Sequence, residues 1–402
     1  MLRAVCRVCS YLCCLLARSR HRAFHPKELP AFISASCGGR NHDQLVTPRT
    51  RVVRSTWRGT NRPVRATPQA GDTRTDRRAQ TTYRMTSIPN PRLDRAPTPT
   101  VAPTPGIRLI RDIYAEHGSQ ERPVLSFEFF PPKTPKGDLA LFERTLPALD
   151  ALRPDFYSVT YGAGGSTRDK TLAIVDRIQR EHGTTTMAHL TCISTSRSDI
   201  ERYLSEARDR GIRNILALRG DPPLESSDEQ FERGFEYSYQ LVEFISKMEG
   251  FSIGTAGFPE SHIACTEGRH VDWQRRKAKI DRGADFVLTQ LFFDNDDYFA
   301  FRDYLVDTLG VTVPITPGIL PILNTRQIKR FTALCGATLP TALASKLDSY
   351  GDDADAVADF GIELASRQCE ALLAGGAPGL HFYSLNKAHA ATQIVENLGL
   401  RD

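Results

Sequence analysis

The chain has 402 residues, and 40% of them are hydrophobic, which is enough for a sizeable core. Its net charge of +5 is uneven: residues 1–104 carry 19 Lys and Arg against 5 Asp and Glu, while the remainder carries 33 against 42. Apolar runs fall far short of the roughly 20 residues of a membrane span, and the four cysteines after residue 105 are too scattered for a disulfide framework. We therefore expect a cytoplasmic protein.

An extension over residues 1–105, rich in Arg, Pro and Thr, comes first. Prolines between Pro89 and Pro105 prevent a helix, and the low apolar content predicts disorder. It could be a signal peptide, an organelle transit peptide or a basic segment that binds nucleic acid. We favour an over-extended reading frame with translation starting at Met85. Only a genuine transit peptide would direct the chain to an organelle.

Eight short segments rich in Val, Ile, Phe and Tyr follow at intervals of about 30 residues, the length of a βα unit. We expect strands at 124–130, 155–162, 186–192, 214–220, 251–258, 286–293, 313–320 and 379–385. Eight such units predict an α/β protein with a (β/α)8 TIM barrel over residues 106–402. An open doubly wound sheet is the alternative, but it usually has fewer strands, and the G-x-G-x-x-G turn of its nucleotide-binding members is missing from this sequence.

Amphipathic stretches between these strands predict helices. One apolar face repeats with helical spacing from Leu139 to Leu149. Two helix starts match the capping-box pattern, Ser166 with Asp169 and Ser198 with Glu201.

The first predicted strand carries an acid near its end. Alternation places Ser126 and Glu128 on one face of this strand and Phe127 with Phe129 on the other. Loss of water around a carboxylate among phenylalanines favours the protonated form, which a general acid needs near neutral pH. A solvated glutamate is the alternative, and inside a barrel we favour the acid.

Polar side chains end several other strands, and in a barrel these ends meet at one mouth. The triplet Arg219, Gly220 and Asp221 suits a polar ligand, and the Gln290 amide offers a donor and an acceptor to a heterocycle edge. His189 alone reads more simply as a core residue. The spacing around His262 matches no common zinc site, so we expect no metal.

Taken in order, eight motifs resemble the methylenetetrahydrofolate reductase family: SFEFFPPK, SVTYGAGGSTRD, AHLTC, ALRGDPP, GFPESH, LTQLFFD, PGILPI and HFYSLNK. The resemblance covers about residue 107 to the C-terminus. It implies a homo-oligomeric flavoprotein in which NADH or NADPH reduces FAD, and reduced FAD converts 5,10-methylenetetrahydrofolate to 5-methyltetrahydrofolate for methionine synthesis. The chain ends with the barrel, so we expect no regulatory domain and no feedback control by S-adenosylmethionine.

The resemblance also implies roles for single residues. Glu128 corresponds to the general acid that helps open the methylene bridge, and Asp221 to the carboxylate near flavin and pterin. The residues expected to hold FAD are Thr160, His189, Arg219, Gly220, Asp221, Tyr237, Ser238, His262, Asp272 and Lys279. Those expected to contact the folate are Gln290, Gln327, Phe331 and Lys387. Lys387 replaces an Arg of the family, which keeps the charge but loses bidentate geometry.

Two alternative functions stay open. A related flavin barrel, proline dehydrogenase, is disfavoured by the FEFFPP and LRGDPP motifs. A nucleic-acid-binding protein that acts through the basic extension is disfavoured by the acidic remainder, which would repel phosphate. We therefore expect small-molecule partners and neither nucleic acid nor a membrane.

Overall fold

The structure, a computed structural model, describes residues 106–400 apart from residues 121, 163–166, 194 and 221–233. The extension over residues 1–105 and the start at Met85 lie outside the described residues. Both therefore stay predictions, as does the boundary between the extension and the barrel.

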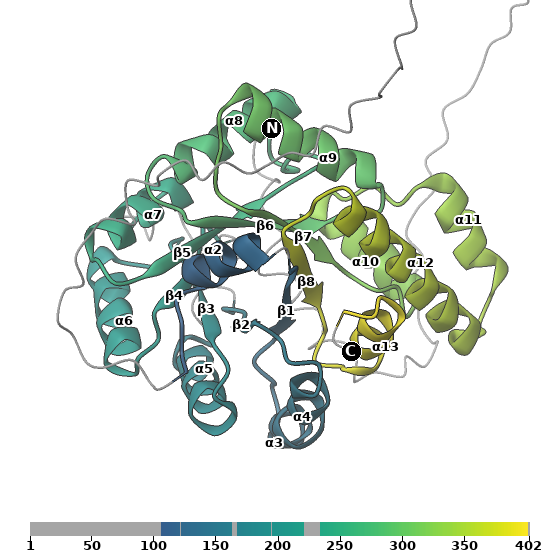
Figure 1. Ribbon diagram of the computed structural model, residues 1–402, viewed down its shortest axis with the longest axis horizontal. Coiled ribbons are helices and arrows are strands. Elements are labelled where there is room, and N and C mark those ends of the chain that lie inside the picture. Colours follow the sequence, from purple (N-terminus) through teal and green to yellow (C-terminus); the bar gives the residue numbers. More distant parts are fainter. Residues whose placement is uncertain (1–105, 121, 163–166, 194, 221–233, 401–402) are drawn as a thin grey trace, which may run out of the picture. The chain divides into compact units, whose positions relative to one another are not determined.

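Eight parallel strands close into a barrel in chain order, with β8 pairing back onto β1 (Figure 1). The strands are β1 Val124–Phe129, β2 Phe156–Val159, β3 Thr186–Thr191, β4 Asn214–Leu218, β5 Ser252–Gly257, β6 Phe286–Leu291, β7 Ile315–Ile319 and β8 Gly379–Tyr383. Each begins within two residues of its predicted start. The predicted TIM barrel is confirmed. Its strands could be located in the sequence because buried parallel strands are near-continuous apolar runs.

Helices surround the strands (Figure 1). They are α2 Ile110–Gln120, α3 Pro135–Ala140, α4 Leu146–Asp150, α5 Arg168–His182, α6 Arg197–Asp209, α7 Ser238–Lys247, α8 Arg269–Ile280, α9 Asn295–Asp303, α10 Thr325–Cys335, α11 Thr341–Ser349, α12 Ala354–Ala374 and α13 His389–Asn397. Two π-helical turns, η1 Leu141–Thr145 and η4 Tyr304–Thr308, follow α3 and α9.

The predicted helix from Leu139 to Leu149 is interrupted. The turn η1 separates α3 from α4, and it leaves Leu139 56% exposed while Phe142, Leu146 and Leu149 are buried. A π-helical turn holds more residues than an α-helical turn. Positions before it therefore fall out of register with the apolar face that follows.

The predicted capping boxes are misplaced by one or two residues. Helix α6 begins after Ser196, whose Oγ accepts from Asp199 N at 3.1 Å and donates to Asp199 Oδ2 at 2.6 Å. Ser198 therefore does not cap this helix, because Ser196 and Asp199 already satisfy each other. Helix α5 begins after Thr167, and Ser166 lies outside the described residues.

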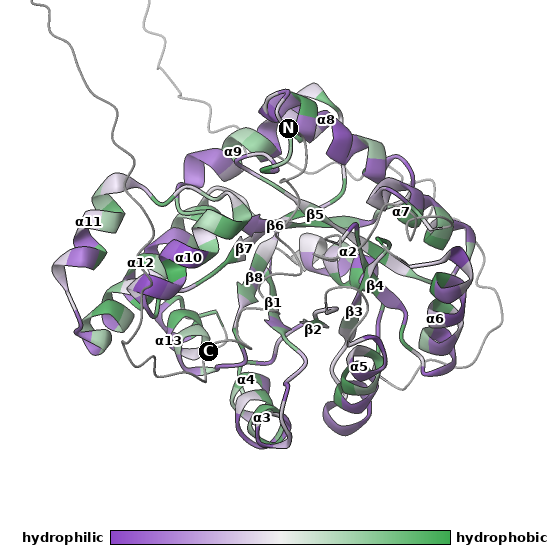
Figure 2. Cartoon of the chain, turned by 180° about the vertical axis from the view of Figure 1, so that it is seen from behind, coloured by the Kyte–Doolittle hydropathy of each residue, from purple (hydrophilic) through white to green (hydrophobic). Residues whose placement is uncertain are grey.

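Strand alternation divides the core into two parts. Side chains such as Phe127 and Phe129 point outward and are fully buried in the main hydrophobic core. At the amino-terminal ends of the strands, side chains that point into the barrel pack together with α2. This cluster contains Ile110, Val124, Phe156, Met187, Leu216 and Phe286. Tyr114 of α2 also hydrogen-bonds Thr316 Oγ1 at 2.7 Å. Figure 2 shows the hydrophobic strands inside the ring of helices. The amino-terminal end of the barrel is thus closed, and any ligand pocket must open at the carboxyl-terminal ends of the strands.

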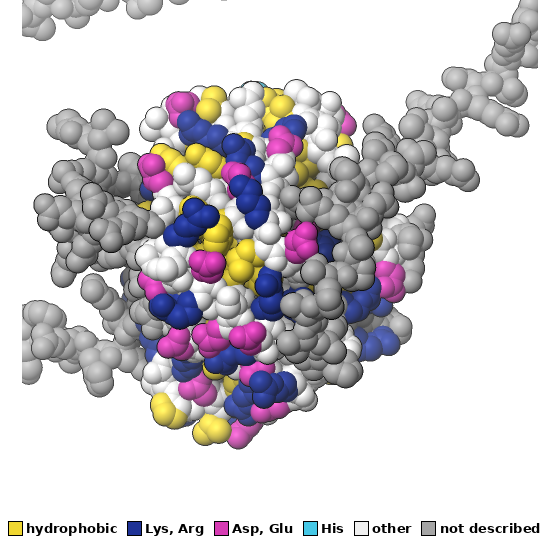
Figure 3. Space-filling model, turned by 90° about the vertical axis from the view of Figure 1, so that its left-hand side faces the viewer, with side chains coloured by type: hydrophobic (Ala, Val, Ile, Leu, Met, Phe, Trp, Pro, Cys, Tyr) yellow, Lys and Arg dark blue, Asp and Glu magenta, His cyan; other side chains and the backbone are white. Residues whose placement is uncertain are grey.

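The outer face over α6 and α7 carries interspersed charges of both signs (Figure 3). Neighbouring turns pair them, as in Arg210 with Glu206 at 2.6 Å and Lys247 with Glu243 at 2.7 Å. Among the described helices, none has the length and apolar character to cross a bilayer. The four cysteines in the described part of the chain are free thiols, as the scattered spacing predicted.

Candidate active site

Inward side chains at the carboxyl ends of the strands line a pocket with about 600 Å³ of atom-free space, part of it open to solvent. It is lined by Glu128, Phe130, Thr160, His189, Leu216, Leu218, Ala256, Phe258, Leu288, Gln290, Leu291, His381 and Tyr383. Most of this lining is apolar, and its polar groups come from five different strands or the turns that follow them. Ligand pockets of barrels have this position and this composition.

Glu128 lies at the centre of the polar lining and is only 6% exposed. Its Oε2 lies 3.4 Å from His189 Nε2 and 3.6 Å from His381 Nε2. Within the described residues, neither imidazole Nε2 has a hydrogen-bond partner, although both atoms are buried. The predicted inward orientation of Glu128 is confirmed, and two imidazoles approach the same carboxylate oxygen.

Burial determines the protonation state of His189. It lowers the pKa of this histidine to about 4, although the Glu128 carboxylate opposes the effect and His381 adds to it. His189 is therefore a neutral imidazole near pH 7, and it lines the pocket.

The end of β8 holds the end of β1 in place. Ser384 Oγ donates to the Glu128 carbonyl at 2.6 Å. Tyr383 OH donates to the Thr289 carbonyl of β6 at 2.6 Å. The backbone that carries the acid is thus fixed from its neighbouring strand, which suits a group that must be positioned accurately.

A buried polar cluster on α8 lies beside this mouth. Asp272, Arg276 and Lys279 are all buried, and the Asp272 carboxylate pairs with Arg276. Asp272 Oδ2 also accepts from the backbone N–H of His262 at 3.1 Å, and the Arg276 guanidinium lies 4.9 Å from the Phe258 ring centre. Burial, with Arg276 nearby, lowers the pKa of His262 to about 4. Asp272 and Lys279 are therefore buried, although their spacing on one helical face would also fit an ordinary solvated pair.

The turn after β4 has a tightly fitted backbone. Gly220 has a φ of +79°, and a Cβ atom there would lie 2.8 Å from Thr191 Cβ. Arg219 Nε donates to the Glu236 carbonyl at 2.9 Å, and its guanidinium lies 5.6 Å from the ring of Tyr237, which is 44% exposed. Ser238 is buried at the first position of α7. Asp221 lies outside the described residues, so its predicted role stays a prediction.

The residues predicted to contact the folate are spread more widely. Gln290 lines the pocket, with its Oε1 accepting from Leu291 N at 2.9 Å. Gln327 and Phe331 lie on α10, where Phe331 is buried in a hydrophobic cluster with the pocket residue Phe130. Lys387 is exposed on the segment after β8. Gln327, Phe331 and Lys387 are not pocket-lining residues in this structure.

Sequence reasoning missed two residues of the site. Arg276 follows Asp272 by one helical turn, a spacing that indicates an ion pair, but nothing in the sequence shows that the pair is buried. His381 stands on β8 in the HFYSLNK motif, and its approach to Glu128 depends on closure of the barrel between the first and last strands. His381 could have been found by asking which polar side chains share the inward face of the strands, whereas the sequence holds no such signal for Arg276.

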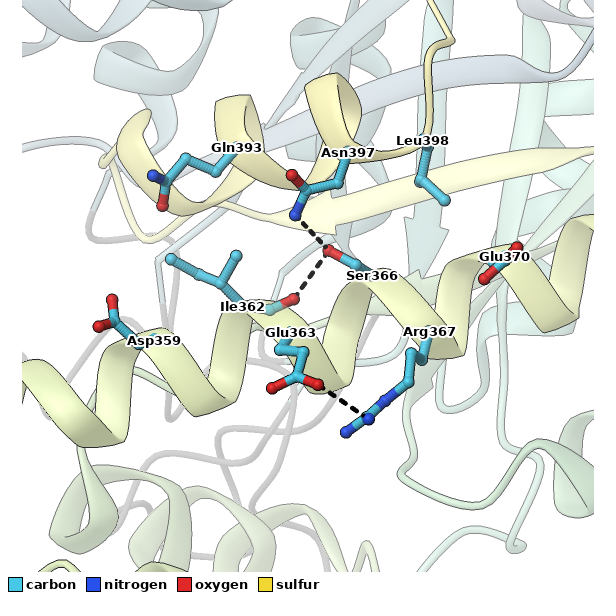
Figure 4. Close-up of a pocket in the computed structure, with 9 residues that line it drawn as sticks. All are labelled: Asp359, Ile362, Glu363, Ser366, Arg367, Glu370, Gln393, Asn397 and Leu398. Atoms are coloured by element: carbon cyan, nitrogen blue, oxygen red, sulfur yellow. Dashed lines mark hydrogen bonds and ion pairs between the residues drawn. The ribbon is translucent and has the colours of Figure 1, made fainter.

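A second cavity, with about 890 Å³ of space that includes open solvent, lies on the outer wall between α12 and α13 (Figure 4). Several of its side chains pair with one another: Arg367 pairs with Glu363 at 2.9 Å, and Asn397 Nδ2 donates to Ser366 Oγ at 3.0 Å. None of the predicted site residues lines it. The mouth of the barrel is therefore the candidate active site, although the outer cavity is larger.

The structure is a closed (β/α)8 barrel of parallel strands, with a pocket and a buried carboxylate at the carboxyl ends of the strands. This is the architecture of a barrel enzyme, whose active site lies at that end. Residues 113–399 match the family described as methylenetetrahydrofolate reductase. The chain belongs to this family.

Relatives from plants and bacteria differ in length. Methylenetetrahydrofolate reductase (NADH) 1 of Zea mays is 40% identical over 297 residues, which are 71% of this chain and 50% of that protein. The 5,10-methylenetetrahydrofolate reductase of Escherichia coli (strain K12) is 35% identical over 277 residues, which are 69% of this chain and 91% of that protein. The chain thus spans about half the length of the plant relative and most of the bacterial one.

Proposed function

We propose that the protein reduces 5,10-methylenetetrahydrofolate to 5-methyltetrahydrofolate, with FAD as cofactor and NADH or NADPH as reductant. Family membership supports the reaction, and the name of the maize relative supports NADH as the reductant to test first. The observation that carries the proposal is the buried Glu128 at the mouth, with two imidazoles beside it.

The residues at the mouth fit a flavin dinucleotide. Leu216, Ala256 and Leu288 give a flat ring an apolar surface. The buried cations Arg276 and Lys279 suit a pyrophosphate. The tight turn at Gly220 lets the backbone approach a ligand closely. Thr160, His189, Arg219, Tyr237, Ser238, His262 and Asp272 would complete the set. When bound, FAD supplies the hydride chemistry.

Glu128 would act on the folate itself. Its carboxyl O–H gives a proton to N10, so that the bond from N10 to the bridging methylene breaks and the methylene becomes electrophilic at N5. A neutral His189 leaves no second positive charge to oppose the cation that develops on the substrate. The Gln290 amide offers both a donor and an acceptor to the pterin edge. The proton and the hydride together account for the two hydrogens gained in the reduction.

The test uses the purified full chain. We expect it to bind FAD with the absorbance of a flavoprotein, to oxidise NADH or NADPH, and to form 5-methyltetrahydrofolate detectable by chromatography. A folded protein that cannot be loaded with FAD would overturn the flavin assignment. A flavoprotein that oxidises NADH but forms 5-methyltetrahydrofolate at no more than the enzyme-free rate would overturn the substrate assignment.

A further inference from the structure

We infer that His381 is a positioning residue for Glu128, with its ring oriented by Ser126 so that Nε2–H faces the carboxylate that forms when the proton leaves. This inference rests on the proposed function, because it concerns the proton that Glu128 gives to the folate. It assigns a role to two side chains, Ser126 and His381, that the preceding mechanism does not use.

The His381 ring is held on three sides. Its Nδ1 lies 2.8 Å from Ser126 Oγ. Phe156 stacks against the ring with centroids 6.2 Å apart, and Tyr383 meets it edge-on at 5.5 Å. The side chain is fully buried. A ring clamped in this way has one orientation, and in that orientation Nε2 faces Glu128.

The surroundings of Ser126 select the tautomer of His381. The Ser126 hydroxyl can donate to His381 Nδ1 at 2.8 Å or to the Leu380 carbonyl at 3.3 Å. We assign the hydroxyl proton to the shorter contact. A hydroxyl that donated to the Leu380 carbonyl would instead accept from Nδ1–H and leave Nε2 without a proton, and that tautomer would overturn the inference. When Ser126 donates to Nδ1, the neutral ring carries its proton on Nε2, so His381 presents a donor to Glu128.

The donor lies 3.6 Å from Glu128 Oε2, which is longer than a hydrogen bond. Catalytic hydrogen bonds are often long without substrate and tighten when it binds. The buried Nε2 lacks a hydrogen-bond partner among the described residues. A hydrogen bond to the carboxylate, once it forms, would remove the free-energy cost of this unsatisfied donor. The bond would stabilise the ionised product of proton transfer and so make Glu128 a stronger acid.

Charged and titratable neighbours are compatible with this role. The groups that face His381 are Glu128 on β1, His189 on β3 and Tyr383 on its own strand. His189 is a neutral imidazole near pH 7. The His189 ring lies among the residues expected to hold the flavin. The contact between Ser126 and His381, in contrast, connects His381 to β1, the strand that carries Glu128. His381 is therefore the better candidate to position Glu128.

Four variants of the full chain test the inference: His381→Leu removes the donor, His381→Gln keeps an amide N–H, Ser126→Ala frees the ring, and Ser158→Ala is the control. Ser158 is a buried serine that lies opposite Glu128 in the register of β2, and its Oγ has no hydrogen-bond partner within the described residues. For each variant, the FAD-loaded enzyme is first reduced by NADH. It is then mixed with methylenetetrahydrofolate, and 5-methyltetrahydrofolate formation is followed across pH.

We expect His381→Leu to slow the folate step about tenfold at its plateau and to move the alkaline fall of its rate to higher pH by about one unit, because the acid is weaker. Ser126→Ala should shift in the same direction by less, and His381→Gln should recover part of the rate. Flavin reduction by NADH should slow less than the folate step in the His381 and Ser126 variants. Ser158→Ala should match wild type in both steps.

An unchanged pH profile, or equal loss in both half-reactions, would show that His381 only fills space and would overturn the inference. If His381→Leu fails to bind flavin, Ser126→Ala decides, since it removes the orienting hydroxyl and keeps the ring. A wild-type enzyme that does not convert the folate would overturn the proposed function, and the inference with it. A wild-type enzyme that converts the folate, with variants that match its profile, would overturn the inference alone.

Discussion

The Asn386 side chain hydrogen-bonds both backbone groups of Phe130. Its Oδ1 accepts from Phe130 N at 2.8 Å, and its Nδ2 donates to the Phe130 carbonyl at 2.8 Å. This pair joins the segment after β8 to the end of β1, two residues from Glu128. Asn386 adopts a φ of +58°, a conformation that Asn tolerates better than most residues with a side chain. This amide and the Ser384 hydroxyl thus both join the end of β1 to the segment after β8.

Asn386→Ala should lower the free energy of unfolding by about 2–4 kcal/mol, because two hydrogen bonds are lost and a partly buried N–H and C=O lose their partner. Urea denaturation measures this change. The control is Asn397→Ala, which loses one exposed bond to Ser366 and should cost about 0.5 kcal/mol or less. Equal losses in the two variants would contradict a special role for Asn386.

Gly220→Ala should destabilise the protein and weaken FAD binding. The new Cβ would lie 2.8 Å from Thr191 Cβ and 2.9 Å from Ile193 Cγ2, in addition to strain from the positive φ. Gly351→Ala is the matched control, because Gly351 has a φ of +58° with nothing near its Cβ position. We expect a loss of about 1 kcal/mol at Gly351 and at least twice that at Gly220. Thermal unfolding and FAD titration report the two effects, and equal losses would show that the contact with Thr191 is unimportant.

Asp272→Ala should cost about 3–5 kcal/mol, because it leaves the buried Arg276 without its carboxylate and frees the His262 backbone N–H. The control pair has the same helical spacing but is exposed: Glu363 and Arg367 have side chains 64% and 60% accessible. Glu363→Ala should therefore change stability by less than about 1 kcal/mol. Chemical denaturation of both variants measures the two losses of stability, and equal losses would contradict the prediction.

Stability should fall in mild acid because of His189. Its pKa in the folded protein is about 4, against an ordinary value of 6.5. Below about pH 6.5, His189 therefore binds a proton in the unfolded chain but not in the folded protein. The stabilisation is complete above that pH, and up to about 3 kcal/mol is lost as the pH falls toward 4. Urea midpoints for wild type and His189→Gln between about pH 7 and pH 4.5 measure this effect. A wild-type curve no steeper than that of the variant would contradict it.

The strands were predictable because each is buried on both faces and reads as a short apolar run. The placement of Glu128 was also predictable, since alternation from Phe127 and Phe129 leaves it only the inward face. The helix starts were less certain, because neighbouring serines such as Ser196 and Ser198 offer competing caps. Local sequence does not show which reciprocal pair will form.

The contacts around Glu128 could not be read from the sequence. Ser126 and His381 are 255 residues apart in the chain, and they meet only because the last strand closes onto the first. The burial of Arg276 likewise depends on which face of α8 packs against the barrel. Motif resemblance implied FAD-binding roles for His189, Asp272 and Lys279. The structure shows that all three side chains are buried, and their roles stay predictions.

Glu128→Gln tests the central claim most directly, because the amide keeps the shape of the side chain but has no acidic proton to give. The FAD-loaded variant and the wild type are each reduced anaerobically by NADH and then mixed with methylenetetrahydrofolate, while flavin absorbance reports both steps. We predict that the variant is reduced at a rate within about twofold of wild type and that its oxidation by the folate is slowed at least a hundredfold. A variant that transfers hydride to the folate at the wild-type rate, or that loses both steps equally, would contradict the assignment of Glu128 as the proton donor.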